Sequence, residues 1–377
     1  MKSVEEQISP GFFARDVEQG RFAPKRLNLN IDEGVRNQVV AGIVQPIRLA
    51  TGADGIRQRI RELVKRSWDT IEIDSEGERT NEPSGSLSPD LLDSILQGDA
   101  LKLYARVPSN SIKLIFTSPP YWQSRQYGGG RSELGREWHP TAYIENLLMH
   151  TIDWKRILTE DGNLYLNLGD CYFGTKGFSR NTGEHKRKTD HHYLGHDKVR
   201  SEGNSFQDKQ LLQLPSRVAI EMQRLGWILR NEIIWTKPNA LPAHANDRRL
   251  PVHEKIFHFV KSRRNYFDLK TAKRLGSHRD HTMHGIEAYK KHQATFPETL
   301  VVPFVLTSSR ENDVVFDPFM GAGTVAVVAK RCQRHWLGFE LVKENWKLAN
   351  ERVKRTERKP YDEADVIRAN RIPPCRS

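Results

Sequence analysis

Cysteine is scarce in this chain of 377 residues, and the three that occur, Cys171, Cys332 and Cys375, lie far apart. This spacing forms neither the paired motifs of a zinc site nor the framework of a disulfide-rich secreted domain. Long hydrophobic runs are also missing, since nowhere do ~18 apolar residues follow one another as a membrane helix requires. The N-terminal segment MKSVEEQISPGFF lacks the apolar core of a signal peptide. We therefore expect a protein of the reducing cytoplasm that has no metal site and no membrane span.

Acidic side chains are the minority among the charged residues. Lys and Arg number 59 against 47 Asp and Glu, which gives a formal net charge of +12. An excess of positive charge suits a polyanionic partner such as nucleic acid. The length admits one large domain with appendages, or two domains.

Short apolar strands alternate with helix-length segments from about residue 91 onward. Strands are predicted at 112–116, 163–168, 228–235, 255–260, 313–316 and 335–339. Helices are predicted near 141–158, 213–225, 298–307, 323–334 and 343–355. Alternation of this kind predicts an α/β sheet with helices on both faces.

The flanks of this alternating region have a different composition. Residues 1–73 contain one predicted helix, at 56–68, and we assign them no role. Residues 74–90 are rich in Ser, Gly, Pro and acidic side chains, which is typical of a linker. We therefore place one domain at 91–357 and a C-terminal tail at 358–377.

Two long segments interrupt the alternation. Residues 171–210 are polar and rich in Lys, Arg and His, and residues 261–291 carry nine basic against three acidic side chains, a net +6. Segments of this length in a compact domain are usually functional or disordered. A solvated surface insertion explains the first segment equally well. We expect a role in target recognition for the second, because it lies between two motif-bearing segments.

The stretch LIFTSPPYW, residues 114–122, ends a buried strand in a rigid turn. That turn displays a hydroxyl, a proline pair and two large rings, from Ser118, Pro119, Pro120, Tyr121 and Trp122. Taken alone, the stretch is explained equally well by a plain Pro-Pro turn with buried aromatic side chains.

A second motif, DVVFDPFMGAGTVAVVAKRC at 313–332, leads from a strand into a helix of small residues. Gly321 and Gly323 permit a tight turn and close backbone approach by a ligand. Glu340 ends the next predicted strand, 17 positions after Gly323, where a carboxylate can accept hydrogen bonds from ribose hydroxyls. The turn lacks the GxGxxG and GK[ST] patterns of pyrophosphate sites. An adenosine compound without phosphate, such as S-adenosylmethionine, therefore fits better.

These motifs together resemble the DNA amino-methyltransferases that use S-adenosylmethionine. The segments NLYLNLGDCY (163–172), GWILRNEIIWTKPNALP (226–242) and HQATFPETL (292–300) are also similar to segments of that family. SPPY precedes FxGxG by about two hundred residues, and this permuted order resembles the β group. The resemblance covers roughly residues 95–355. It implies a Rossmann-like methyltransferase fold in which the SPPY half comes before the cofactor-binding half.

The resemblance also implies roles for individual residues. The Ser118 side chain and the Pro119 carbonyl would accept hydrogen bonds from the target amine, in a turn that Pro120 makes rigid. Tyr121 and Trp122 would stack on a base rotated out of the duplex. The residues implied around the cofactor are Asp317, Phe319, Gly321, Gly323, Glu340, Phe296, Pro297 and Asp99. DNA contacts are expected from Trp122, Arg263, Arg264, Lys270, Lys273 and Arg274, some to phosphates and some to base edges.

The first position of the SPPY motif bears on the target base. The family resemblance implies that a Ser at this position is found mostly in enzymes that methylate cytosine N4, and an Asp or Asn mostly in enzymes that methylate adenine N6. We expect N4-cytosine methylation of double-stranded DNA in a restriction–modification system, and the enzyme would be located in the cytoplasm and associated with the nucleoid. A cognate nuclease would act separately. Adenine N6 methylation, an RNA methyltransferase and a non-catalytic DNA-binding protein are the alternatives.

Overall fold

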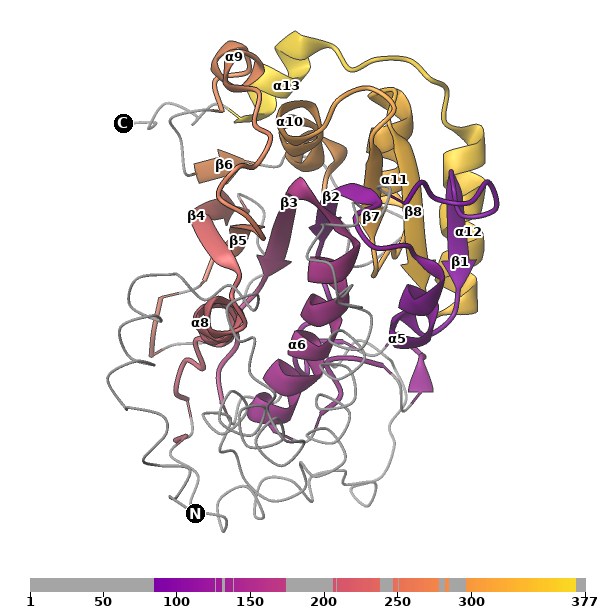
Figure 1. Ribbon diagram of the computed structural model, residues 1–377. Helices are drawn as coiled ribbons and strands as arrows, with labels where there is room; N and C mark the ends of the chain where they lie inside the picture. Colours follow the sequence, from indigo (N-terminus) through magenta and orange to yellow (C-terminus); the bar gives the residue numbers. More distant parts are fainter. Residues whose placement is uncertain are drawn as a thin grey trace, which may run out of the picture. The chain divides into compact units, whose positions relative to one another are not determined.

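A computed structural model gives the structure of the chain, and Figure 1 shows its elements. It describes residues 85–125, 127–130, 133–137, 139–173, 206–207, 209–237, 247–249, 251–277, 282–284 and 296–370. The chain divides into two compact units, and all described residues belong to the second, which begins at Gly52. The predicted helix at 56–68 lies outside the described residues, as do the N-terminal extension, most of the linker and most of the 171–210 segment. None of the described helices is long and apolar enough to cross a membrane.

The described strands form one eight-stranded sheet in the order β1-β8-β7-β2-β3-β5-β4-β6. Their bounds are β1 Ser94–Gln97, β2 Ile112–Thr117, β3 Leu158–Leu168, β4 Ile228–Thr236, β5 His253–Val260, β6 Thr282–His284, β7 Val314–Asp317 and β8 His335–Glu340. β5 is antiparallel to both of its neighbours, and every other pair in the sheet is parallel. The carboxyl ends of β1, β8, β7, β2 and β3 therefore meet at one edge of the sheet. We call this the carboxyl edge, and the opposite one the amino edge.

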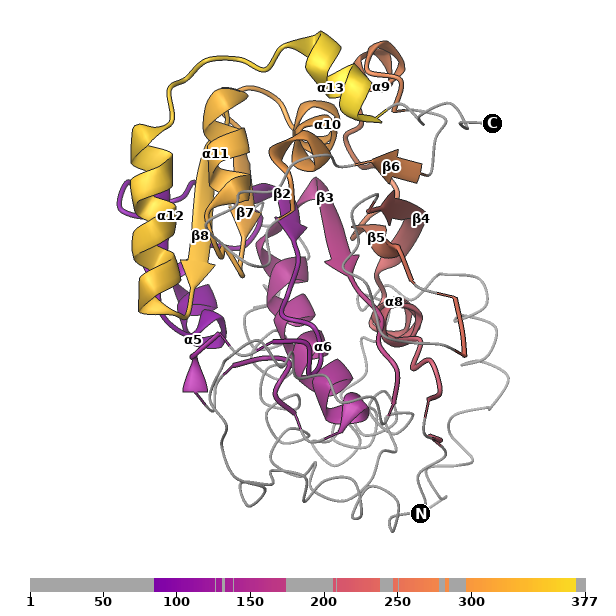
Figure 2. The same cartoon turned by 180° about the vertical axis from the view of Figure 1, so that it is seen from behind.

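Helices cover both faces of the sheet, as predicted (Figures 1 and 2). Their bounds are α5 Ala100–Leu103, α6 Pro140–Ile157, α8 Leu214–Arg224, α9 Leu269–Arg274, α10 Glu298–Ser308, α11 Thr324–Arg331, α12 Lys343–Arg355 and α13 Glu363–Asn370, with a 3-10 turn at Tyr104–Arg106. One apolar core joins α6 and α8 to the sheet, and the other joins α10 and α11. In β7 and β8 successive residues alternate between the two cores, as the two-residue period of a strand requires.

The domain continues beyond residue 357, the boundary predicted from the sequence. Helix α13 packs against α10, and its Val366 is 1% exposed within the second core. Tyr361 donates a 2.7 Å hydrogen bond to Glu298 at the start of α10. The prediction was wrong because this helix is short and contributes few apolar side chains to the core, too few to produce a helical pattern in the sequence.

Candidate active site

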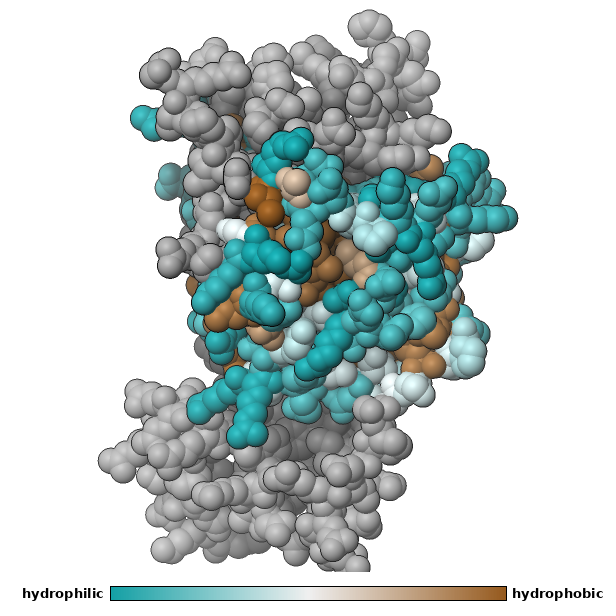
Figure 3. Space-filling view, turned by 90° about the horizontal axis from the view of Figure 1, so that it is seen from above, coloured by the Kyte–Doolittle hydropathy of each residue, from teal (hydrophilic) through white to brown (hydrophobic). Residues whose placement is uncertain are grey.

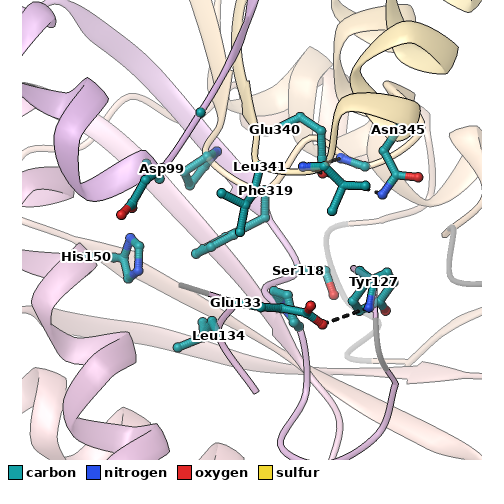
Figure 4. Close-up of a pocket in the computed structure, with 16 residues that line it drawn as sticks. Asp99, Ser118, Tyr127, Glu133, Leu134, His150, Phe319, Glu340, Leu341 and Asn345 are labelled. Atoms are coloured by element: carbon teal, nitrogen blue, oxygen red, sulfur yellow. Dashed lines mark hydrogen bonds between the residues drawn. The ribbon is translucent and has the colours of Figure 1, made fainter. Parts of the chain in front are cut away.

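A pocket opens at the carboxyl edge, where β1, β2, β7 and β8 end (Figure 4). The predicted residues that line it are Asp99, Ser118, Pro120, Phe319, Gly321 and Glu340. Ser118 follows β2 directly, whereas Phe319 and Gly321 follow β7. The topology therefore brings the SPPY turn and the glycine turn to one pocket, although they are separated by about two hundred residues of sequence.

The glycine turn is held in place by a buried carboxylate. Glu340 accepts hydrogen bonds from the Gly321 amide at 2.7 Å and from the Val342 amide at 2.9 Å. Gly323 has φ of +80°, and a Cβ there would lie 3.1 Å from Ala349 of α12. Burial raises the pKa of Glu340. Oε1 also accepts from the Asn345 side-chain amide at 3.5 Å, but Oε2 still has a further lone pair, so Glu340 can support the turn and accept from a ligand hydroxyl together.

Asp317 does not line the pocket, but its side chain links the SPPY turn to the glycine turn. Its Oδ1 accepts from the Thr117 hydroxyl at 2.7 Å and from the Phe319 amide at 2.9 Å. The side chain is buried, and this burial raises its pKa to about 7. Asp317 therefore connects the end of β2 to the end of β7, and this differs from the direct cofactor contact expected from the sequence.

Phe296 and Pro297 also lie outside the pocket lining. The Phe296 ring packs on Phe116 with the ring centroids 5.4 Å apart, within the second core. Pro297 precedes α10 as its N-cap residue. Both were expected to wall the cofactor pocket, but they help to seat α10 against the sheet instead. Gly323 does not line the pocket either, and its role is to form the turn as the N-cap residue of α11.

Several lining residues were not predicted, and Glu133 and His150 are the most informative. Glu133 is 6% exposed and accepts from the amides of Tyr127 at 2.8 Å and Gly129 at 2.9 Å. His150 packs edge-on against Phe319, and burial lowers its pKa to about 3, so the ring is neutral. Neither residue belongs to a motif that marks it in the sequence, because both come from the segment and helix that follow the SPPY turn.

Behind Ser118 lies a polar cluster that the sequence did not reveal. The Ser118 and Tyr121 hydroxyls are 3.1 Å apart, and Tyr121 donates to Glu254 Oε2 at 2.6 Å. Glu254, at the start of β5, forms an ion pair with Lys237, which follows β4. Asn167 of β3 donates from Nδ2 to Glu254 at 2.9 Å and to Tyr121 at 3.0 Å. Three neighbouring strands thus support the SPPY turn.

Trp122 is not available to stack on a base, contrary to the expectation. The side chain is 5% exposed within the first core, and its indole N–H donates to the Glu137 carbonyl at 2.8 Å. Tyr121, by contrast, is only partly buried, and it directly follows Pro120, which lines the pocket. Its ring packs so closely on Gly169 that a Cβ at that position would lie 2.6 Å from it. Tyr121 is therefore the one of the two rings that can contact a target base.

The basic residues proposed for DNA contact lie at the amino edge, away from Ser118. Because β5 runs against its neighbours, the residues after Val260 emerge at the end where β3 begins, and the Tyr266 amide donates to the Asp161 carbonyl at 2.8 Å. Figure 3 views the domain from this side and shows a largely hydrophilic face. Arg274 there is paired with Glu363 of α13. The residues that this placement removes from the pocket edge are Arg263, Arg264, Lys270, Lys273 and Arg274.

Comparison with known proteins identifies the family. A family model described as DNA methylase matches residues 112–351. The chain belongs to this family. The Type II methyltransferase M.Cfr9I of Citrobacter freundii is 36% identical over 268 residues, which cover 69% of this chain and 87% of that protein. M.SmaI of Serratia marcescens is 35% identical over 270 residues, covering 69% and 90%.

The solved structure of the PvuII DNA methyltransferase, described as cytosine-N4-specific, has the same fold. It superimposes with a TM-score of 0.53 at 21% identity, covering 73% of this chain and 90% of that one. The predicted Rossmann-like methyltransferase fold and the predicted family are thus both confirmed.

S-adenosylmethionine is the cofactor of this DNA methylase family, and the pocket residues fit it. Asp99, Glu133 and Glu340 place three carboxyl groups on the pocket lining. The described part of the chain offers no ion-pair partner to any of them. An acidic lining suits a ligand that carries a sulfonium, an ammonium group and ribose hydroxyls.

Proposed function

We propose that this DNA methylase transfers a methyl group from S-adenosylmethionine to the N4 amine of cytosine in double-stranded DNA. The observation that carries the proposal is the position of Ser118, which lines the same pocket as Gly321 and Glu340. The Type II designation of its relatives and the cytosine specificity in the name of the PvuII enzyme support the same reading. The Type II names also support a role in a restriction–modification system.

The chemistry explains why a hydroxyl and a rigid carbonyl are needed. The lone pair of an exocyclic amine is delocalised into the ring, which makes the amine a poor nucleophile. Acceptors on its N–H groups hold it towards tetrahedral geometry as the new N–C bond forms. Ser118 Oγ and the Pro119 carbonyl are the acceptors we assign. The Pro119-Pro120 pair fixes the backbone, so little freedom is lost when the base binds.

The bound cofactor would supply an activated methyl group, whose carbon a correctly placed amine attacks while the sulfonium sulfur leaves as a neutral thioether. The remaining work of the chain is to position the base and exclude water. The Tyr121 ring is held by Gly169 on one side and through its hydroxyl by Glu254. A preorganised ring of this kind can receive a base that has rotated out of the duplex.

The experiment is to methylate duplex DNA with the purified protein, digest it to nucleosides and separate them by mass spectrometry. We expect N4-methylcytosine, and a Ser118→Ala variant should form it at least ~10²-fold more slowly while it still binds the cofactor. N6-methyladenine as the product would overturn the assignment of the base. Methylation of RNA in place of DNA would overturn the assignment of the substrate.

A further inference from the structure

The hydroxyl of Ser118 belongs to a chain of hydrogen bonds that ends on an ion pair. Starting from the pocket, the chain runs from Ser118 to Tyr121 and from Tyr121 to Glu254, which is paired with Lys237. Glu254 is 9% exposed, so its contact with the Tyr121 hydroxyl is shielded from water, whereas the Lys237 side chain is 35% exposed. Shielding strengthens such a contact and makes an unpaired group costly, so the directions of the hydrogen bonds are well defined.

Counting hydrogens determines these directions. An ionised carboxylate only accepts, so the one hydroxyl hydrogen of Tyr121 must point to Glu254. Burial, followed by the nearby Glu254 carboxylate, raises the pKa of Tyr121 well above its usual value of 10, so this hydrogen is present at neutral pH. The Tyr121 oxygen can then only accept, and the partner within reach that has a hydroxyl hydrogen is Ser118 at 3.1 Å.

We propose that the Glu254–Lys237 ion pair, acting through Tyr121, orients the Ser118 hydroxyl so that its oxygen faces the target amine as an acceptor. The inference rests on the proposed function and deepens it. A serine hydroxyl can either accept from an amine N–H or donate to the neighbouring ring nitrogen. Here its hydrogen is directed to Tyr121, so accepting from the amine is the use that remains. Glu254 is a positioning residue, because it acts on the base through two other side chains.

The orientation of Asn167 agrees with this polarity. Its Nδ2 lies 2.9 Å from Glu254, 3.0 Å from Tyr121 and 3.3 Å from Ser118. Its Oδ1 is buried, and no donor among the described residues reaches it. The amide turns its nitrogen inward although its oxygen is then unsatisfied, which indicates that the three oxygens facing it accept from it. The reverse orientation would place the amide oxygen against the Glu254 carboxylate.

The test is a double-mutant cycle on single-turnover methylation. Tyr121→Phe keeps the ring on Gly169 but removes the link, and Glu254→Gln removes the charge. We expect each to lower the rate about tenfold or more, with cofactor and DNA dissociation constants and Tm close to those of the wild type. Because Glu254 acts through Tyr121, the double variant should be within about threefold of Tyr121→Phe.

The matched control is Glu232→Gln, which breaks the Glu232–Lys255 ion pair of the same β4–β5 hairpin. It should leave the single-turnover rate unchanged. Effects of Glu254→Gln and Tyr121→Phe that multiply fully in the double variant would overturn the proposal, as would a Glu254→Gln rate within twofold of the wild type.

The failure of this inference and the failure of the proposed function are distinguishable. If Ser118→Ala is inactive on cytosine while Tyr121→Phe and Glu254→Gln are both fully active, only the role assigned to the ion pair is wrong. If Ser118→Ala retains full activity, or the product is not N4-methylcytosine, the proposed function itself is wrong.

Discussion

Thr117 and Asp317 are 200 positions apart in the chain, and their side chains meet in a 2.7 Å hydrogen bond at the carboxyl ends of β2 and β7. The bond joins the last residue of the strand before the SPPY turn to the last residue of the strand before the glycine turn. The two strands are paired in parallel. A direct side-chain contact therefore joins the half of the domain that contains the SPPY turn to the half that contains the glycine turn.

The buried carboxyl of Asp317 predicts a pH dependence of folding stability. Its pKa is about 7 in the fold against an ordinary value of 3.8 for an aspartate side chain, so between these pH values the folded state retains a proton that the unfolded state has lost. The contribution of Asp317 to stability is thus present below pH ~4 and is lost as the pH rises through ~7, by up to about 4 kcal/mol. Asp317→Asn should therefore gain stability relative to the wild type between pH 5 and pH 8, measured by urea unfolding.

The control for this experiment is Asp362→Asn, since Asp362 is an exposed carboxyl that caps the α13 segment. This variant removes one surface carboxyl and so corrects for the change in formal charge. If the difference in free energy of unfolding between Asp317→Asn and the wild type does not vary with pH, the raised pKa assigned to Asp317 is wrong.

Glu340→Ala should weaken the binding of S-adenosylmethionine by one to two orders of magnitude. Hydrogen bonds to a charged acceptor contribute roughly 1.5–3 kcal/mol, and the variant also leaves the Gly321 and Val342 amides without their partner. Isothermal titration calorimetry measures the affinity, and the rise in Tm on adding cofactor provides an independent check. Glu344→Ala on the exposed side of α12 serves as the control. Wild-type affinity in Glu340→Ala would remove Glu340 from the ligand site.

The placement of the basic residues predicts which arginines contact DNA. Arg249 is exposed in the segment that leads into β5 at the carboxyl edge, beside Arg248, which packs on Tyr172. Arg249→Gln should weaken duplex binding and lower its log–log salt slope by about one unit. Arg263→Gln combined with Arg264→Gln at the amino edge should leave the slope unchanged. A loss of slope in the second variant alone would restore the interface expected from the sequence.

Gly169→Ala should slow methylation without affecting the cofactor. A Cβ at this position would lie 2.6 Å from the Tyr121 ring, so the ring must move away from Gly169 and from its partners Glu254 and Asn167. We expect the single-turnover rate to fall about tenfold or more, because small misplacements of positioned groups are costly in rate. Cofactor affinity measured by calorimetry is the internal control. An unchanged rate would show that the ring position is not needed.

Truncation after residue 357 should destabilise the domain, whereas truncation after residue 370 should not. The shorter chain loses the buried Val366 and the hydrogen bond from Tyr361 to Glu298. Burial of one such aliphatic side chain and one hydrogen bond to a charged group each contribute on the order of 1–3 kcal/mol. Thermal unfolding of the two truncated chains and the full chain measures the difference. Equal Tm values would show that α13 is dispensable.

The sequence alone determined the elements whose signal is local. The six predicted strands are those with apolar runs, and each overlaps a strand of the sheet. The strands β1 and β6 were not predicted, because four and three residues are too few to show an alternating pattern. The two turns that line the pocket were also predicted, since proline pairs and clustered glycines constrain the backbone wherever they occur.

The tertiary structure decided what depends on strand direction and strand order. Glu254 reaches Tyr121 only because β5 is reversed and so begins at the edge where β2 and β3 end. The same reversal carries the basic segment after β5 to the amino edge. Burial decided that Trp122 packs in the core while the adjacent Tyr121 is only partly buried. Neither the direction of a strand nor the side of a turn that becomes buried is encoded in the local pattern, because both follow from long-range packing.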